Sequence, residues 1–205
     1  YDKNFTYLIT CSRTGTQAIV DAAIDTSEIA QFLRNDPVAI LITHGHSDHI
    51  AFLDNFVKEY PGATILGHPD SRLKEGYPNF KRVDNNQEFI IGEMRFKCIH
   101  TPGHYFDSIC YQISPVLFTG DTMFVGRTGR IKGKYSSIED LYDSIYNKIL
   151  KMPGSIKIYP GHDYGDKPNI TLEENILNSP LLSANSLDEF KKRMDDYEKN
   201  RKIGS

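Results

Sequence analysis

The chain has 205 residues, 24 of them Lys or Arg and 27 Asp or Glu, which gives a formal net charge of -3. This charge excludes a general attraction to nucleic acid or to an anionic membrane, and no run of about 18 apolar residues predicts a transmembrane helix. Hydrophobic residues make up 39% of the sequence, so we expect a sizeable core in a single domain that spans residues 1–205.

The first half of the chain predicts short strands and two helices. A turn at Ser12-Arg13-Thr14-Gly15 joins the first two strands, and Pro61-Gly62 ends the second helix. Thr26 or Ser27 can cap the first helix. The predicted strands are 5–11, 18–21, 38–43 and 64–67, and the predicted helices are 26–34 and about 49–60.

The second half is denser in strands and ends in a helix. The predicted strands are 89–91, 94–100, 108–113, 116–119 and 156–159, and the predicted helices are 137–152 and about 186–201. Leu187, Phe190, Met194 and Tyr197 form an apolar stripe on the last helix, which we expect to pack on the parent domain. Strands with helices in both halves predict an α+β fold in which two sheets pack face to face with helices outside.

The three cysteines, Cys11, Cys98 and Cys110, are odd in number and lie far apart in strand-like segments. This pattern favours buried thiols in a reducing compartment over a disulfide framework. No secretory signal is visible, and the start at Tyr1 rather than Met leaves open whether an N-terminal segment has been removed. We therefore predict a cytoplasmic protein.

The segment Thr43-His44-Gly45-His46-Ser47-Asp48-His49-Ile50 is the most informative part of the sequence. It places three imidazoles and a carboxylate in a loop directly after a buried strand. Crowding such groups together is costly without compensation. A divalent cation removes the cost by accepting lone pairs from His nitrogens and carboxylate oxygens.

Three further ligand-type residues, His104, Asp121 and His162, each follow an apolar run. A glycine precedes each of them and allows the chain to turn sharply into a crowded site. A single His is more often a hydrogen-bonded core residue than a ligand. Spacing, glycine context and strand-end placement together favour the metal interpretation for the whole set.

The ordered motifs H-x-H-x-D-H, T-P-G-H, G-D-T and P-G-H-D-Y resemble those of the metallo-β-lactamase superfamily. The resemblance runs from about residue 5 to residue 182 and implies an αβ/βα sandwich of two mixed sheets with a site for two divalent metal ions. Zinc is the first expectation, with iron or a zinc and iron pair as alternatives. One metal would take His44, His46 and His104; the other would take Asp48, His49 and His162; and Asp121 would bridge both.

Several later motifs resemble the glyoxalase II and persulfide dioxygenase branch of that superfamily. They are Gly120-Asp121-Thr122-Met123-Phe124-Val125-Gly126, Gly129-Arg130 and the segment 173–182. The branch implies a small thiol-derived substrate. The chain departs from it at Tyr105-Phe106-Asp107, where small residues are usual, and at Ile131-Lys132, where persulfide dioxygenases continue with T-D-F. It also ends soon after one helix, whereas glyoxalase II has a longer helical C-terminal domain.

The resemblance implies a metallohydrolase, a glyoxalase II-like (hydroxyacylglutathione hydrolase-like) thioesterase that cleaves a small glutathione-type thioester with a metal-bound hydroxide. Asp48 and Asp121 would be catalytic carboxylates as well as ligands. The alternative is an iron-dependent sulfur (persulfide) dioxygenase with His44, His104 and Asp121 around one iron.

Substrate contacts are expected from Arg130, Tyr105 and Tyr164. Arg130 lies in a cationic run that also holds Arg127, Lys132 and Lys134, and it would clamp a substrate carboxylate; the alternative is a solvated loop. The two tyrosines would line the pocket, although aromatic residues are more often core. We expect a small-molecule partner and neither nucleic acid nor membrane; the oligomeric state is open, with a homodimer as one option.

Overall fold

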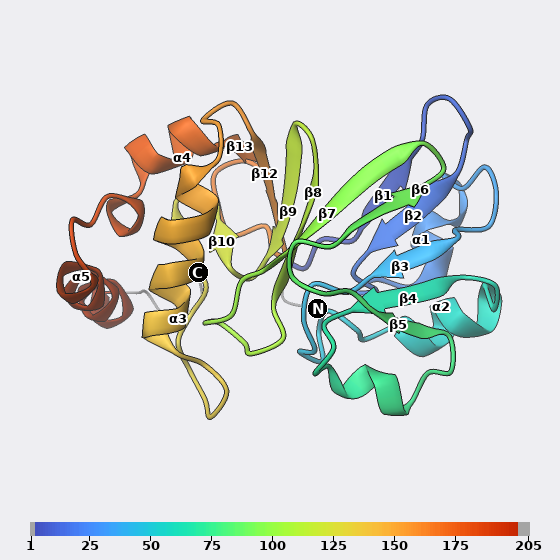
Figure 1. Cartoon of the computed structure of the whole chain (residues 1–205), viewed down its shortest axis with the longest axis horizontal. Coiled ribbons are helices and arrows are strands. Elements are labelled where there is room, and N and C mark those ends of the chain that lie inside the picture. The colour runs from blue at the N-terminus through green and yellow to red at the C-terminus, as the bar shows by residue number, and fades with distance from the viewer. Residues whose placement is uncertain (1–2, 201–205) are drawn as a thin grey trace.

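A computed structural model describes residues 3–200, and two β-sheets form its centre (Figure 1). The first sheet has the order β1-β2-β3-β4-β5, and its strands run parallel apart from the antiparallel pair β1 and β2. Its strands are β1 (Tyr7–Thr10), β2 (Gln17–Val20), β3 (Ala39–Leu41), β4 (Thr64–Gly67) and β5 (Phe80–Arg82).

The second sheet has the order β13-β12-β9-β8-β7-β6, in which only β12 and β9 pair in parallel. Both sheets are therefore mixed, as the sequence predicted. The strands are β6 (Glu88–Ile91), β7 (Met94–His100), β8 (Ile109–Ile113), β9 (Val116–Gly120), β12 (Lys157–Pro160) and β13 (Ile170–Thr171). A separate short hairpin joins β10 (Met123–Phe124) to β11 (Arg127–Thr128).

Both faces of each sheet are buried, and successive side chains along a strand point into different cores. On β2, Ala18 and Val20 face the core between the sheets, which also takes Phe96 and Tyr111 from the second sheet. Ile19 faces the opposite way, into a core beneath the helices of the first half. Apolar residues on both faces explain why the strand segments read as continuous hydrophobic runs. The result is the four-layered αβ/βα arrangement that the motifs implied.

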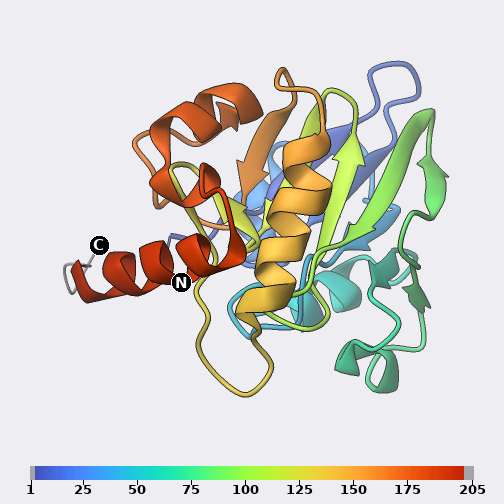
Figure 2. The same ribbon diagram turned by 60° about the vertical axis from the view of Figure 1, so that its left-hand side comes forward.

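Helices cover the two outer faces (Figures 1 and 2). The first sheet packs on α1 (Thr26–Ala30) and α2 (Leu53–Glu59), with a short 3-10 turn, η1 (Arg72–Glu75), nearby. On the second sheet, α3 (Ile138–Tyr142) continues through a π-helical segment, η2 (Asp143–Lys148), and a 3-10 turn, η3 (Ile149–Lys151). The remaining elements are α4 (Leu172–Asn178), η4 (Pro180–Leu182) and α5 (Leu187–Asn200).

Most predicted elements are present, with shifted ends. Helix α1 ends at Ala30 rather than residue 34, and α2 begins at Leu53 rather than residue 49. The later start arises because the backbone of residues 49–52 is tied to Ala22, whose N–H donates to the His49 carbonyl oxygen and whose carbonyl oxygen accepts from Phe52. Strands β5, β10, β11 and β13, each of two or three residues, were not predicted.

The last helix packs as its apolar stripe predicted. Phe190 and Met194 of α5 are buried, and Tyr197 packs against the same core. The predicted final residue, 201, lies outside the described residues, as do residues 1–2 and 202–205. The three cysteines are buried and free, as expected. No helix within the described residues is long and apolar enough to cross a lipid bilayer.

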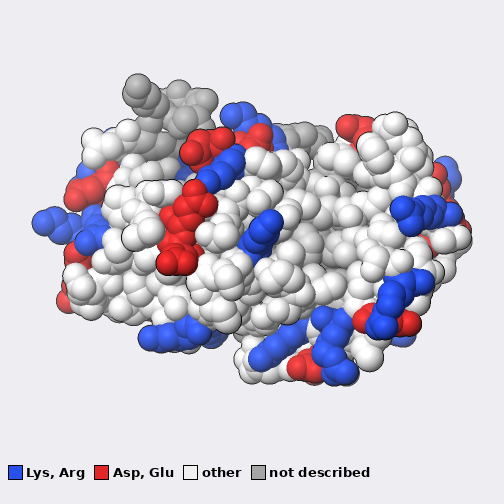
Figure 3. Space-filling model, turned by 90° about the horizontal axis from the view of Figure 1, so that it is seen from above, with Lys and Arg blue, Asp and Glu red and all other residues white. Residues whose placement is uncertain are grey.

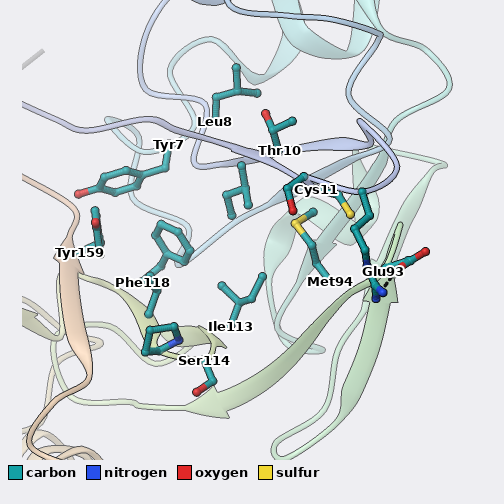
Figure 4. A pocket seen from close by; sticks show the side chains of 15 residues that line it. Tyr7, Leu8, Thr10, Cys11, Glu93, Met94, Ile113, Ser114, Phe118 and Tyr159 are labelled. Atoms are coloured by element: carbon teal, nitrogen blue, oxygen red, sulfur yellow. Dashed lines mark ion pairs between the residues drawn. The ribbon is translucent and has the colours of Figure 1, made fainter.

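A cavity of about 510 Å³ opens at one edge of the seam between the sheets (Figure 4). Tyr7, Phe118 and Tyr159 form its aromatic wall, with ring centroids 5.1 to 5.7 Å apart. It reaches the Val116 end of β9, whereas Asp121 follows the other end of that strand, and its lining holds none of the predicted site residues. Over the face shown in Figure 3, cationic and anionic side chains are intermixed around a broad uncharged area.

Candidate metal centre

All predicted ligands lie in loops that follow the carboxyl ends of strands. His44, His46, Asp48 and His49 follow β3, and His104, Asp121 and His162 follow β7, β9 and β12. The ends of these strands meet at one edge of the sandwich. The structure therefore brings together seven side chains that span 119 positions in sequence, and it gathers them into overlapping groups of ligand atoms that lie within 4.8 Å of one another.

The first group holds the rings of His44, His46 and His104. Nδ1 of His46 lies 2.9 Å from Nε2 of His44 and 3.0 Å from Nε2 of His104. Nitrogens around a tetrahedral zinc are roughly 3.3 Å apart, given Zn–N bonds of about 2.0–2.1 Å. The three nitrogens thus have nearly the spacing that one cation requires.

The second group holds Asp48, His49 and His162. Nε2 of His162 lies 3.3 Å from Nε2 of His49 and 3.3 Å from Oδ2 of Asp48. Asn4, near the start of the chain, donates its Nδ2–H to the same Asp48 oxygen at 2.9 Å. Asn4 was not predicted at the site, since it lies 44 positions from Asp48.

Asp121 reaches both groups. Its Oδ1 lies 3.2 Å from Nε2 of His49, and its Oδ2 lies 3.3 Å from Nε2 of His162 and 3.5 Å from Nε2 of His104. This intermediate position is the one expected of a bridging carboxylate.

The donor set fits two divalent cations. Asp121 Oδ1 is buried, and no described residue supplies a hydrogen bond to it. Nδ1 of His46 faces two other imidazole nitrogens at once, more than one ring proton can satisfy. Buried lone pairs without donors are costly, and a divalent cation would satisfy them together. The fold and these clusters together imply divalent metal binding.

Neighbouring groups orient two of the ligand rings. Nδ1 of His104 donates to the Arg130 carbonyl oxygen at 2.9 Å, and Nδ1 of His49 faces Oδ2 of Asp21 at 2.8 Å. In each case the second nitrogen, Nε2, points to the site, where a bound cation would take its lone pair. Such contacts select the ring tautomer that a metal needs.

Asp21 is a functional residue that the sequence reading missed. It is buried and also accepts hydrogen bonds from the backbone N–H and the hydroxyl of Thr43, at 2.8 and 2.7 Å. It therefore fixes both His49 and the start of the loop after β3. Its position directly after the apolar strand β2 is the same kind of signal that marked the ligands.

Burial and mutual repulsion keep two imidazoles neutral. Burial, reinforced by the nearby His49, holds the pKa of His44 well below its usual value, and burial lowers the pKa of His46 to about 4. Burial opposes ionisation of Asp121, but His49 and His162 outweigh it and hold its pKa well below normal. Burial also opposes protonation of His49, but Asp121 and Asp21 outweigh it and raise the pKa of His49 well above its usual value, so His49 would release a proton when it binds a cation. Neutral imidazoles and ionised carboxylates are the forms that bind metal.

The predicted substrate contacts lie on two sides of the centre. Tyr164 stacks on the ring of His162 with centroids 4.5 Å apart, and it lines a cavity of about 80 Å³ together with His104, Asp121 and Arg130. Tyr105 lies on the other side, 4.2 Å from the His46 ring, and borders a second small cavity. The structure therefore places all three residues beside the ligands; contact with substrate stays a prediction.

Asp107, which stands where the related motif has a small residue, holds the loop that carries His44 and His46 by a hydrogen bond to its backbone. Its Oδ1 accepts a hydrogen bond at 3.1 Å from the N–H of Gly45, between His44 and His46. The side chain is buried, and burial raises the pKa of Asp107 to about 6.

The comparisons with known proteins agree with this geometry. The family model for the metallo-beta-lactamase superfamily matches residues 2–162. The probable polyketide biosynthesis zinc-dependent hydrolase PksB of Bacillus subtilis is 28% identical over 83% of this chain and 78% of its own length. The hydroxyacylglutathione hydrolase of Francisella tularensis subsp. novicida is 34% identical over 79% of this chain but only 64% of its own length, so the chain spans less than two thirds of that relative.

Among solved structures, ETHE1 from Myxococcus xanthus is 27% identical and superposes with a TM-score of 0.86, covering 95% of this chain and 86% of the other. These findings place the chain near both the hydroxyacylglutathione hydrolases and ETHE1, the two directions in which its motifs pointed.

The substitution Gly161→Ala adds one methyl group next to the ligands and tests how closely they are packed. The added Cβ would collide with Asp121 Oδ1 and lie 2.7 Å from Cε1 of His49. Gly161→Ala should therefore lower metal affinity about tenfold or more, as measured by metal content after gel filtration. Gly62→Ala is the control, since nothing lies within 4 Å of its Cβ. Equal metal content in both variants would contradict the assigned site.

The buried carboxyl of Asp107 predicts a pH effect on stability. Its pKa of about 6 in the folded chain lies above the unfolded value, which is about 3.9. The folded chain therefore binds more protons between these values, and the side chain's contribution to stability is lost as pH rises through 6. Asp107→Asn keeps an oxygen that can accept from Gly45 but does not titrate.

Relative to the parent protein, metal-free Asp107→Asn should gain about 2 kcal/mol of unfolding free energy between about pH 4.5 and about pH 7.5. Chemical denaturation in the presence of a chelator measures this difference. Asp166→Asn, at an exposed position, is the control and should show no such trend. If the difference in unfolding free energy between Asp107→Asn and the parent protein does not change with pH, the pKa of Asp107 is not raised in the folded chain and the prediction is wrong.

Proposed function

Because this chain belongs to the metallo-β-lactamase superfamily, we propose that it is a glyoxalase II-like thioesterase that hydrolyses small thioesters of the glutathione type. The observation that carries the proposal is the convergence of seven donors into two groups joined by Asp121. The names of two relatives, a zinc-dependent hydrolase and a hydroxyacylglutathione hydrolase, support hydrolysis as the reaction and zinc as the metal.

Bound at these donors, two divalent cations would lower the pKa of a shared water toward ~7 and polarise a thioester carbonyl. The chain's own residues would hold and orient the reactants. Asp121 ties the two donor groups together, and Asp48, whose side chain is 29% exposed, faces the open side of the site. A partly exposed carboxylate anchored by Asn4 can accept a proton and release it to solvent.

The cavity of about 80 Å³ would receive the part of the substrate next to the reacting carbonyl. Tyr164 and Phe124 give it an aromatic wall, with centroids 5.3 Å apart. Such a wall suits a small acyl or thiol group and restricts how it can turn. Tyr105 and Phe106 would form the opposite rim, where bulky rings replace the small residues of the related motif.

A second candidate is an iron-dependent sulfur dioxygenase acting on a persulfide. It would use His44, His104 and Asp121, since two imidazoles and one carboxylate are the usual ligands of non-haem iron oxygenases. The observations that favour it are that Nε2 of His104 lies 3.5 Å from Oδ2 of Asp121 and that the ring centroids of His44 and His104 lie 5.2 Å apart. In this alternative His49 and His162 would be hydrogen-bonding neighbours of the iron ligands rather than ligands themselves.

The thioesterase proposal predicts turnover by zinc-loaded protein of S-lactoylglutathione or simpler thioesters. His44→Ala should lower kcat/KM at least 100-fold, because one cation loses a direct ligand. His68→Ala is the matched control: His68 stacks on His100 with centroids 4.2 Å apart and belongs to none of the ligand groups. If zinc-loaded parent protein hydrolyses the thioesters no faster than His44→Ala does, the result counts against the proposal.

Metal analysis of protein purified under mild conditions separates the two candidates. The thioesterase predicts about two zinc ions per chain and no oxygen uptake. About one iron per chain, with oxygen consumed in the presence of glutathione persulfide, would instead establish the dioxygenase.

A further inference from the structure

The end of helix α5 forms one wall of the cavity beside the metal ligands. Phe190 and Met194 anchor the helix in the core, and its last turns reach the loop that follows Asp121. Tyr197 lines the cavity together with Arg127 and Arg130. Figure 2 shows the helix at the flank of the second sheet, close to the lower end of α3. The C-terminal helix therefore helps to shape the site as well as the core.

Both guanidinium groups at this wall are engaged by the protein itself. Arg130 Nη2 lies 3.2 Å from Oε2 of Glu198, and Lys132 Nζ lies 3.5 Å from the same oxygen. Arg127 donates to the Tyr197 hydroxyl at 3.1 Å and to the Tyr164 carbonyl oxygen at 2.6 Å. Its guanidinium also sits over the Tyr164 ring, 4.5 Å from the centroid.

The ion pair changes what the cationic wall can do. An unpaired arginine would attract a substrate carboxylate, as the sequence predicted for Arg130. Arg130 already has a carboxylate partner, because Oε2 of Glu198 lies 3.2 Å from its Nη2. A substrate carboxylate would have to share the Arg130 guanidinium with Glu198 and would be repelled by the negative charge of Glu198. Side-chain exposures of 39% for Arg130 and 27% for Glu198 mean that water screens this effect to a moderate size.

We propose that Glu198 is a specificity-determining residue that weakens the binding of thioesters whose thiol arm places a carboxylate near this wall. This inference rests on the proposed thioesterase function and narrows its substrate class. Glu198 comes from α5, 68 positions beyond Arg130. Glu198 does not line the cavity itself, so it acts through Arg130, which does.

The test compares two substrates that share an acyl group. S-lactoylglutathione carries carboxylates on its thiol arm, whereas S-lactoyl-N-acetylcysteamine carries none. Glu198→Gln should lower KM for the glutathione thioester about 3-fold to 10-fold, the size expected of a partly exposed ion pair. Its kcat for that substrate should stay within about twofold, and both constants for the neutral thioester should be unchanged.

Two further variants distinguish an effect of the Glu198 charge on substrate specificity from a general disturbance of α5. Glu198→Asp keeps the charge and should restore discrimination between the substrates. Glu189→Gln removes a carboxylate from the same helix that pairs with Arg193 rather than with the cavity, and it should leave both KM values unchanged. A fall in KM for both thioesters with Glu198→Gln, or an equal shift with Glu189→Gln, would overturn the assignment to Glu198.

Binding of glutathione alone, by isothermal titration calorimetry, tests the inference without turnover. Glutathione should bind Glu198→Gln about 3-fold to 10-fold more tightly than parent protein, and ionic strength should weaken the difference. Equal affinities would overturn the inference. If zinc-loaded parent protein hydrolyses neither thioester, the proposed function fails, and the titration still decides whether Glu198 repels anions from this cavity.

Discussion

The convergence of seven lone-pair donors at one edge of the sandwich, four of them buried, is the constraint on which the rest of the structure depends. Five imidazoles and two carboxylates crowd there with nitrogen–nitrogen separations as short as 2.9 Å. Such a cluster is unfavourable by itself, and the surrounding chain is arranged to hold it. Strands from both sheets end at this edge, and Gly161 leaves room for Asp121 and His49 where any side chain would collide.

The ligands were predictable from sequence because their signal is local. Each follows a hydrophobic strand directly, and the first four lie within six residues of one another. The order of strands and helices in the two halves made the two-sheet architecture predictable as well. Element ends were less accurate, since the contacts of Ala22 with the loop that follows β3 decide where α2 begins.

Residues that act through long-range contacts were not predictable in the same way. Asp21 reaches His49 across 28 positions, and Asp107 reaches Gly45 across 62. The sequence marks Arg130 as a candidate anion clamp but contains no sign that Glu198 faces it. These pairings depend on how the sheets and α5 pack, so they appear only with the three-dimensional structure. They set the charge and shape around the ligand set.

The most direct test of the account is a crystal structure of the purified protein, with anomalous diffraction recorded at the zinc and iron absorption edges. We expect two neighbouring peaks, one bound by His44, His46 and His104 and the other by Asp48, His49 and His162, with Asp121 touching both. The absence of anomalous density among these side chains in metal-replete crystals, with their rings turned away from one another, would contradict the central claim.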